Sequence, residues 1–166
     1  MLKLSKKIDY ALIALMHLAR QDERASSARE VASIYGMPQD LLAKVLQRLA
    51  RSGLVVSRQG MKGGYSLARP AEAITVARVI EVIEGQPSLT QCFTDLGACA
   101  QFDTCNIKSP LQRLNDEVLL MLSRMTIARM CDDDHASFRG EGTSAAVTVA
   151  DDVQLPVIQD QYQRND

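Results

Sequence analysis

The sequence predicts a mainly α-helical fold class: a winged helix-turn-helix with a two-stranded wing, a cysteine-bearing loop and a long C-terminal dimerisation helix. Two observations predict the central unit. Residues 26–53 form two short helical patterns that each stop at a glycine and are separated by Pro38. Residues 54–68 then follow the pattern of a strand, a glycine-rich turn and a second strand. This order is that of a helix-turn-helix followed by a β-hairpin wing.

Three further helices are predicted around this unit. Residues 5–20 place apolar side chains at a period close to that of a helix, and Ser5 is an N-cap candidate. Residues 71–85 form the next helix, with Thr75 as a possible N-cap. A long helix over residues 110–130 carries apolar residues at three- and four-residue steps: Leu111, Leu114, Val118, Met121, Leu122 and Met125. That stripe fits a helix that pairs with its twin in a homodimer, although packing on its own domain would give the same pattern.

The distribution of charge suggests a partner for the first half of the chain only. The 166 residues carry a net charge of −1. Residues 1–70 contain 12 Lys/Arg and 5 Asp/Glu, residues 71–130 contain 5 and 7, and residues 131–166 contain 2 and 8. A basic first half favours a polyanion, while a solvated surface of mixed charge is the plainer explanation. No apolar run could cross a bilayer and the start lacks the pattern of a signal peptide, so we expect a cytoplasmic protein without a membrane partner.

The segment 26–69 has the residue types that hold duplex DNA. The N-terminal part of the second helix of such a motif enters a major groove, where amide side chains can read base edges. Lysine and arginine on that helix suit phosphates, and a glycine-rich wing flanked by cations suits a minor groove. A solvated helix face and a flexible hairpin turn are the plainer alternatives. The candidate DNA-contacting residues are Gln39, Lys44, Gln47, Arg48, Arg51, Arg58, Lys62, Gly63, Gly64 and Tyr65.

Three cysteines stand close together in the segment between the helices. Cys92, Cys99 and Cys105 have the spacing Cys-x6-Cys-x5-Cys, which in a cytosolic protein is not a disulfide framework. Thiolates suit iron–sulfur clusters and zinc. Zinc sites usually contain Cys-x2-Cys pairs, which are absent, and the wider spacing favours a cluster. Redox-active or incidental thiols are the alternatives.

The whole pattern resembles the iron–sulfur-sensing winged-helix regulators typified by IscR, NsrR and RirA. The resemblance covers residues 1 to about 130 and rests on the segments 4–12, 49–55 and 58–65, together with the three-cysteine loop and the long helix after it. It implies a homodimeric transcription factor rather than an enzyme, bound to double-stranded operator DNA. It also implies a cluster, 2Fe-2S or 4Fe-4S, that reports iron, cluster supply, nitric oxide or redox stress.

The resemblance also bears on the fourth cluster ligand. The IscR branch has a histidine three residues after the third cysteine, where this chain has Lys108. The NsrR branch uses an aspartate in the first helix of the partner subunit, and Asp9 matches that position. His17 is a fallback ligand but more often such a residue is a core histidine, and Cys131 is expected to be a bystander. Ala43 stands where the IscR branch has a glutamate that tunes which sites are bound.

We therefore expect a winged-helix DNA-binding domain over residues 1–85, a cluster-binding loop over 86–109, a dimerisation helix over 110–131 and an acidic, disordered tail over 132–166. The leading hypothesis is a repressor that senses cluster status and, by analogy, controls iron–sulfur cluster assembly genes. A nitric-oxide- or iron-responsive repressor of the same family and a cluster-free thiol redox switch are the alternatives. A small redox enzyme or electron carrier is disfavoured because it would need neither the basic half nor the wing.

Overall fold

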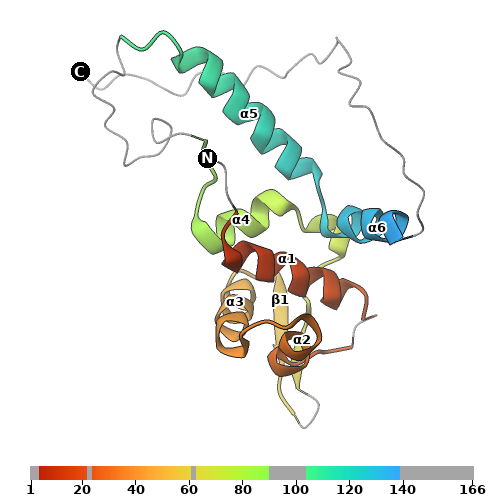
Figure 1. Ribbon diagram of the computed structural model, residues 1–166. Coiled ribbons are helices and arrows are strands. Elements are labelled where there is room, and N and C mark those ends of the chain that lie inside the picture. Colours follow the sequence, from red (N-terminus) through yellow and green to blue (C-terminus); the bar gives the residue numbers. More distant parts are fainter. Residues whose placement is uncertain (1–3, 22–23, 61–62, 90–103, 139–166) are drawn as a thin grey trace.

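The computed structural model describes residues 4–21, 24–60, 63–89 and 104–138. The elements are α1 (Lys6–Ala19), α2 (Ala28–Tyr35), α3 (Gln39–Arg51), β1 (Val55–Arg58), β2 (Gly64–Leu67), a short 3-10 helix η1 (Ala71–Ala73), α4 (Val76–Glu84), α5 (Lys108–Arg124) and α6 (Ile127–Phe138). Figure 1 shows α1 to α4 gathered into one body, with α6 beside α1 and α5 extending away. The predicted fold class, mainly helical with a two-stranded wing, is confirmed. Within these ranges, no helix combines the length and the apolar character that crossing a bilayer requires.

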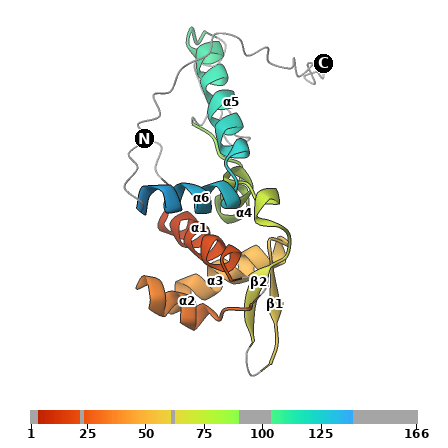
Figure 2. The same ribbon diagram turned by 90° about the vertical axis from the view of Figure 1, so that its right-hand side faces the viewer.

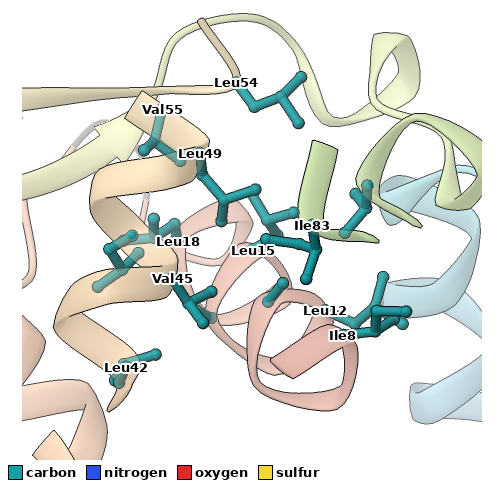
Figure 3. Packing of buried hydrophobic residues seen from close by; sticks show 14 of the residues in the cluster. Ile8, Leu12, Leu15, Leu18, Leu42, Val45, Leu49, Leu54, Val55 and Ile83 are labelled. Carbon is teal, nitrogen blue, oxygen red and sulfur yellow. The ribbon is translucent and has the colours of Figure 1, made fainter. Parts of the chain in front are cut away.

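Helix α1 is the centre of the hydrophobic core, because its apolar side chains recur at every third or fourth residue. It packs against α3, α4, α6 and strand β2. Ile8 and Leu15 are almost fully buried, and Figure 3 shows side chains of α1 meeting those of α3 and α4. Ser5 occupies the predicted N-cap position, but its hydroxyl makes no capping hydrogen bond. Helix α1 thus fixes α3 and α4 relative to each other.

Helices α2 and α3 form the predicted helix-turn-helix. The hydroxyl of Ser27 caps α2 by accepting a hydrogen bond from the backbone N–H of Glu30 at 3.1 Å. Gly36 ends α2 in the left-handed conformation, with a φ of 63°, which glycine adopts without steric cost. Pro38 is the N-cap residue of α3. The predicted inward face of α3 is buried, and it consists of Leu42, Val45, Leu46 and Leu49.

Strands β1 and β2 form the predicted wing. They pair antiparallel, in a register that runs from Val55 opposite Leu67 to Arg58 opposite Gly64. Gly60, in the turn between them, has a φ of 134°, a conformation that side chains rarely adopt. The base of the wing contacts α1 and α3, and the two strands run outward from the helical body (Figure 2). The wing therefore projects from the same body that contains α3.

The prediction of one continuous dimerisation helix over residues 110–131 is wrong at its C-terminal end. Helix α5 stops before Met125, and the separate helix α6 starts after Thr126. Met125 is extended, with a φ of −81° and a ψ of 112°, and the hydroxyl of Thr126 caps α6 by accepting a backbone N–H at 3.2 Å. A threonine hydroxyl that caps a new helix competes with continuation of the old one. Residues 132–138, predicted as the start of the disordered tail, belong to α6, and the rest of the tail lies outside the described residues.

A backbone bridge joins the start of α4 to the start of α6. Thr75 and Thr126 form an isolated antiparallel β-bridge. The N–H after each threonine donates a hydrogen bond to the carbonyl before the other, at 2.8 and 2.9 Å. Each threonine also caps the helix that follows it, so the prediction for Thr75 is confirmed. The segment from the start of α4 to the end of α5 therefore has its two ends joined by this Thr75–Thr126 bridge.

Candidate functional site

Helix α3 presents a polar and largely cationic face to solvent. Gln39, Lys44, Gln47, Arg48 and Arg51 are all exposed. The buried leucines of α3 occupy the other side of the same helix. The structure therefore brings the five predicted α3 residues onto one accessible surface, which is the arrangement that contact with a duplex needs.

A groove of about 450 Å³ between α1 and α3 gathers four cations: Lys7, Lys44, Arg48 and Arg51. Apolar side chains of α3 and α4 complete its lining. Within the described part of the chain, none of the four pairs with a carboxylate. Neighbouring like charges repel, so such a surface favours a polyanionic partner. Sequence reasoning missed Lys7, because only the fold shows that Lys7, rather than its neighbour Lys6, faces α3.

The predicted wing residues divide between solvent and internal contacts. Arg58 is exposed at the end of β1, while Lys62 lies outside the described residues. A Cβ atom on Gly63 would lie 2.7 Å from the carbonyl oxygen of Arg58, and one on Gly64 would lie 2.6 Å from the backbone that precedes α2. Tyr65 is half-buried and packs against the core. The two glycines thus allow close backbone approaches within the wing and to the start of α2, and Tyr65 packs the wing on the core. Arg58 is a predicted wing residue that is exposed to solvent.

His17 is a buried polar residue of α1, with 6% of its surface exposed. Its Nδ1 lies 3.3 Å from the hydroxyl oxygen of Tyr35, and its Nε2 lies 3.2 Å from that of Ser26. Burial lowers the pKa of His17 below its ordinary value of 6.5, because desolvation disfavours the charged ring; the charge of Glu30 opposes this shift and that of Arg20 adds to it. Both ring nitrogens are engaged inside one protomer, which favours a core histidine over a cluster ligand.

The structure describes only the two ends of the cysteine segment. Cys105 is half-buried shortly before α5, whereas Cys92 and Cys99 lie outside the described residues. The carboxylate of Asp9 lies 3.9 Å from the ammonium of Lys6, and 41% of the Asp9 side chain is exposed. An exposed pair at this distance holds the carboxylate weakly. Among the residues that the structure describes, no three His, Cys, Asp or Glu side chains gather into a metal-binding group.

Asn115 attaches the first end of the cysteine segment to α5. It is 8% exposed, and its Oδ1 accepts a hydrogen bond from the backbone N–H of Leu89 at 3.1 Å. Leu89 is the last described residue before the cysteines. Both residues line a groove of about 320 Å³ bordered by the start of α1, the end of α4 and α5. Sequence reasoning missed Asn115, although an amide residue within an apolar helical stripe indicates a buried side chain that hydrogen-bonds another segment.

Cys131 lies away from the cysteine segment, on α6. Its sulfur is 3.9 Å from the carbonyl oxygen of Met16, and the side chain packs against the core around α1. This position favours the predicted role of a bystander that packs α6 onto α1.

Comparisons with known proteins agree on one family. A family model described as Rrf2, iron-dependent transcriptional regulator, matches residues 4–133. The chain is 34% identical over 128 residues to "Protein aau3" of Rhizobium meliloti (strain 1021), an alignment that covers 76% of this chain and 82% of that protein. It is similar to the structure of CymR (YrzC), described as the global cysteine regulator of B. subtilis, with 28% identity and a TM-score of 0.66 over 80% of this chain and 98% of that one. The structure of T. potens IscR has 28% identity and a TM-score of 0.64, over 82% of this chain and 90% of that one.

Proposed function

This chain belongs to the Rrf2 family of transcriptional regulators, and we propose that it is a homodimeric repressor that binds operator DNA and senses iron–sulfur cluster status. The observation that carries the proposal is the cationic surface of α1 and α3, whose charges have no acidic partner among the described residues. That surface stands beside a wing whose Arg58 is exposed. Duplex DNA is a polyanion whose neighbouring major and minor grooves can be contacted by both elements at once.

In this proposal, α3 enters the major groove. Gln39 and Gln47 face base edges, where amides can donate and accept hydrogen bonds. The two lysines and two arginines of the α1–α3 groove contact phosphates on the same side. Arg58 and Lys62 carry the wing to the neighbouring minor groove, where a guanidinium responds to groove width. Affinity then depends strongly on salt, because each neutralised phosphate releases counterions.

The donor set proposed for the cluster is Cys92, Cys99, Cys105 and Asp9. Thiolates are the usual protein ligands of iron–sulfur clusters, and carboxylate oxygens are harder donors that bind more labilely. The exposure of Asp9 and the 3.9 Å distance to Lys6, its ion-pair partner among the described residues, support the proposal because the carboxylate can exchange partners at little cost. When bound, the cluster would be a group that is lost when iron is short or when oxidants or nitric oxide attack it.

Helix α5 is proposed as the dimerisation helix. Three large apolar side chains are about half exposed, namely the N-cap residue Ile107 by 54% and, on the helix, Leu114 by 49% and Met121 by 59%. They follow one another at seven-residue intervals, which is the period of one seam of a two-stranded coiled coil. Cys105 lies next to this helix, and Asp9 lies on α1, which packs against α3. A cluster held by Cys105 of one protomer and by Asp9 of its partner would therefore bias the spacing of the two α3 helices.

The signal and the target genes are assigned by analogy within the family. We favour control of iron–sulfur cluster assembly genes, because a cluster sensor that controls cluster supply completes a feedback loop. A nitric-oxide- or iron-responsive repressor uses the same parts. The similarity to CymR, described as a cysteine regulator, supports a second candidate, a cluster-free thiol switch built on the same cysteines.

Purification without oxygen separates the two candidates. We expect coloured protein with an iron–sulfur absorbance spectrum. Changing Cys92, Cys99 or Cys105 to Ala should abolish the colour, whereas the matched control Cys131→Ala should keep it. Colourless wild-type protein that contains zinc, or no metal, would contradict the cluster proposal and favour a thiol switch. Selection of duplexes from a random pool tests DNA binding separately from the cofactor.

A further inference from the structure

Strand β2 of the wing is bonded through its backbone to Ser26, just before α2, in addition to the contacts of the wing with α1 and α3. The backbone N–H of Ser26 donates to the carbonyl of Tyr65 at 3.0 Å, and the N–H of Tyr65 donates to the carbonyl of Ser26 at 2.8 Å. The neighbouring Gly64 lies so close that a Cβ atom would be 2.6 Å from the Ser26 carbonyl group. Ser26 directly precedes Ser27, the N-cap of α2. Ser26 therefore couples the position of β2 to the start of α2.

The side chain of Ser26 is held by the imidazole of His17. Ser26 is 1% exposed, and its hydroxyl lies 3.2 Å from Nε2 of that ring. Nδ1 of the same ring lies 3.3 Å from the hydroxyl of Tyr35, the last residue of α2, and the two rings meet edge to face at 5.6 Å. One ring therefore contacts both ends of the first helix of the motif, and through Ser26 it reaches the wing.

We propose that His17 is a positioning residue for DNA binding, which sets the placement of the wing relative to α3. Helix α2 packs against α3, and β2 is bonded to Ser26, so His17 lies where the supports of the two DNA-contacting elements meet. A neutral imidazole offers one donor and one acceptor, which two hydroxyl groups match in either tautomer. Any buried histidine needs partners for both ring nitrogens, but here one of the two partners is Ser26, the residue that bonds β2 of the wing. The inference rests on DNA binding by the family and goes beyond the proposed residues that touch DNA.

The test uses His17→Phe, which keeps a ring and removes both hydrogen bonds. Binding is measured to a duplex selected by the wild-type protein from a random pool. We expect affinity to fall by about fivefold to tenfold, as for other directly coupled residues. In an Arg58→Ala/Lys62→Ala background the same change should cost less than about twofold, because a misplaced wing loses only what those two side chains contribute. A merely structural role would make the two changes additive.

A matched control separates positioning from loss of stability. Val79→Ala creates a small cavity at a fully buried residue of α4, a helix outside the helix-turn-helix and the wing. It should lower the melting temperature as much as His17→Phe does, while the folded protein binds the selected duplex as wild type does. Equal losses of affinity in the two variants would overturn the inference.

Two milder variants keep the test decisive if His17→Phe does not fold. Tyr35→Phe removes one hydroxyl from a residue that is 40% exposed, and Ser26→Ala removes the other while leaving the backbone bridge to the wing. Both should fold, and Ser26→Ala should show the stronger coupling to Arg58→Ala. Wild-type affinity in both variants would overturn the role of His17. Failure of the wild-type protein to select any duplex would instead contradict DNA binding itself.

Discussion

In the proposed dimer, replacing Leu114 by aspartate should weaken the association of the two protomers without unfolding either one. Leu114 lies in the middle of α5, and 49% of its surface is exposed in the isolated protomer. Ile107 and Met121, one heptad away on either side, are exposed to a similar extent. By contrast Asn115, the next residue along, faces inward and is 8% exposed. The substitution therefore alters the outer face of the helix and leaves its inner contacts intact.

The size of the effect follows from the exposed fraction. Full burial of a leucine side chain contributes about 1.5–3 kcal/mol, so covering the exposed half of Leu114 contributes roughly 1 kcal/mol. A two-fold dimer contains the contact twice, which gives about 2 kcal/mol and raises the dissociation constant about 30-fold. Aspartate adds two facing charges that lose water, so this figure is a lower bound. The free energy of unfolding of the protomer should change by only about 0.5 kcal/mol, as for exposed positions elsewhere.

Sedimentation equilibrium over a range of concentrations measures the dissociation constant, and circular dichroism reports the fold. Gln112→Asp is the matched control, because it adds the same charge to the same helix at an exposed position on another face. If Leu114→Asp dimerises as tightly as wild type, or if Gln112→Asp weakens the dimer equally, the coiled-coil seam on α5 is refuted.

Four further outcomes are expected. Lys7→Ala should lower the salt dependence of duplex binding by about one unit of slope while Lys6→Ala should not, and equal slopes would remove the α1–α3 groove from the interface. Gly64→Ala should lower the free energy of unfolding by roughly 2–4 kcal/mol in urea titrations, because the new methyl group collides with backbone and breaks two hydrogen bonds; a change below about 1 kcal/mol would contradict the close approach. The pKa of His17 is lower in the folded protein than its ordinary value of 6.5. As pH falls below about 6.5, His17 is therefore protonated in the unfolded chain before it is protonated in the folded one. The free energy of unfolding should fall over this range and level off below the folded-state pKa. A His17→Phe protein with the same pH slope in chemical denaturation would assign that slope to other groups. Asp9→Ala should change the absorbance spectrum and shorten the lifetime of the cluster without unfolding the protein, whereas an unaltered cluster would leave Asp9 only a helix-dipole charge.

Much of the fold could be predicted because its boundaries are set by glycine, whose backbone is unusually free, and by proline, whose backbone is unusually restricted. Gly36 and Pro38 mark the turn of the motif, since few other residues suit a left-handed cap or a fixed φ at a helix start. The end of α5 could not be predicted in this way. Its apolar period continues past the break, and the pairing that interrupts the helix joins Thr126 to Thr75, which are far apart in sequence. Periodicity reports which face of a helix is apolar, but it does not report such long-range hydrogen bonds.

The candidate site divides along the same line. The predicted α3 residues share the polar face of one helix, so their exposure could be predicted from the spacing of polar and apolar residues along that helix. Lys7 and Asn115 depend on which neighbour each side chain meets, and that neighbour belongs to another element. His17 is the sharpest case, because its two partners are Ser26 and Tyr35, nine and eighteen residues away. From sequence alone it could be described only as a core residue or a ligand.

The Thr75–Thr126 bridge has a consequence for how this chain tolerates change in length. Everything from α4 to the end of α5 starts and finishes at neighbouring points, so the cysteine segment is an insertion with pinned ends. Adding a residue to such a loop costs little, since doubling a loop's length costs only about 0.6 kcal/mol of closure entropy. Sensor segments of different reach could therefore be exchanged between relatives while the spacing of α1, α3 and the wing stayed as it is.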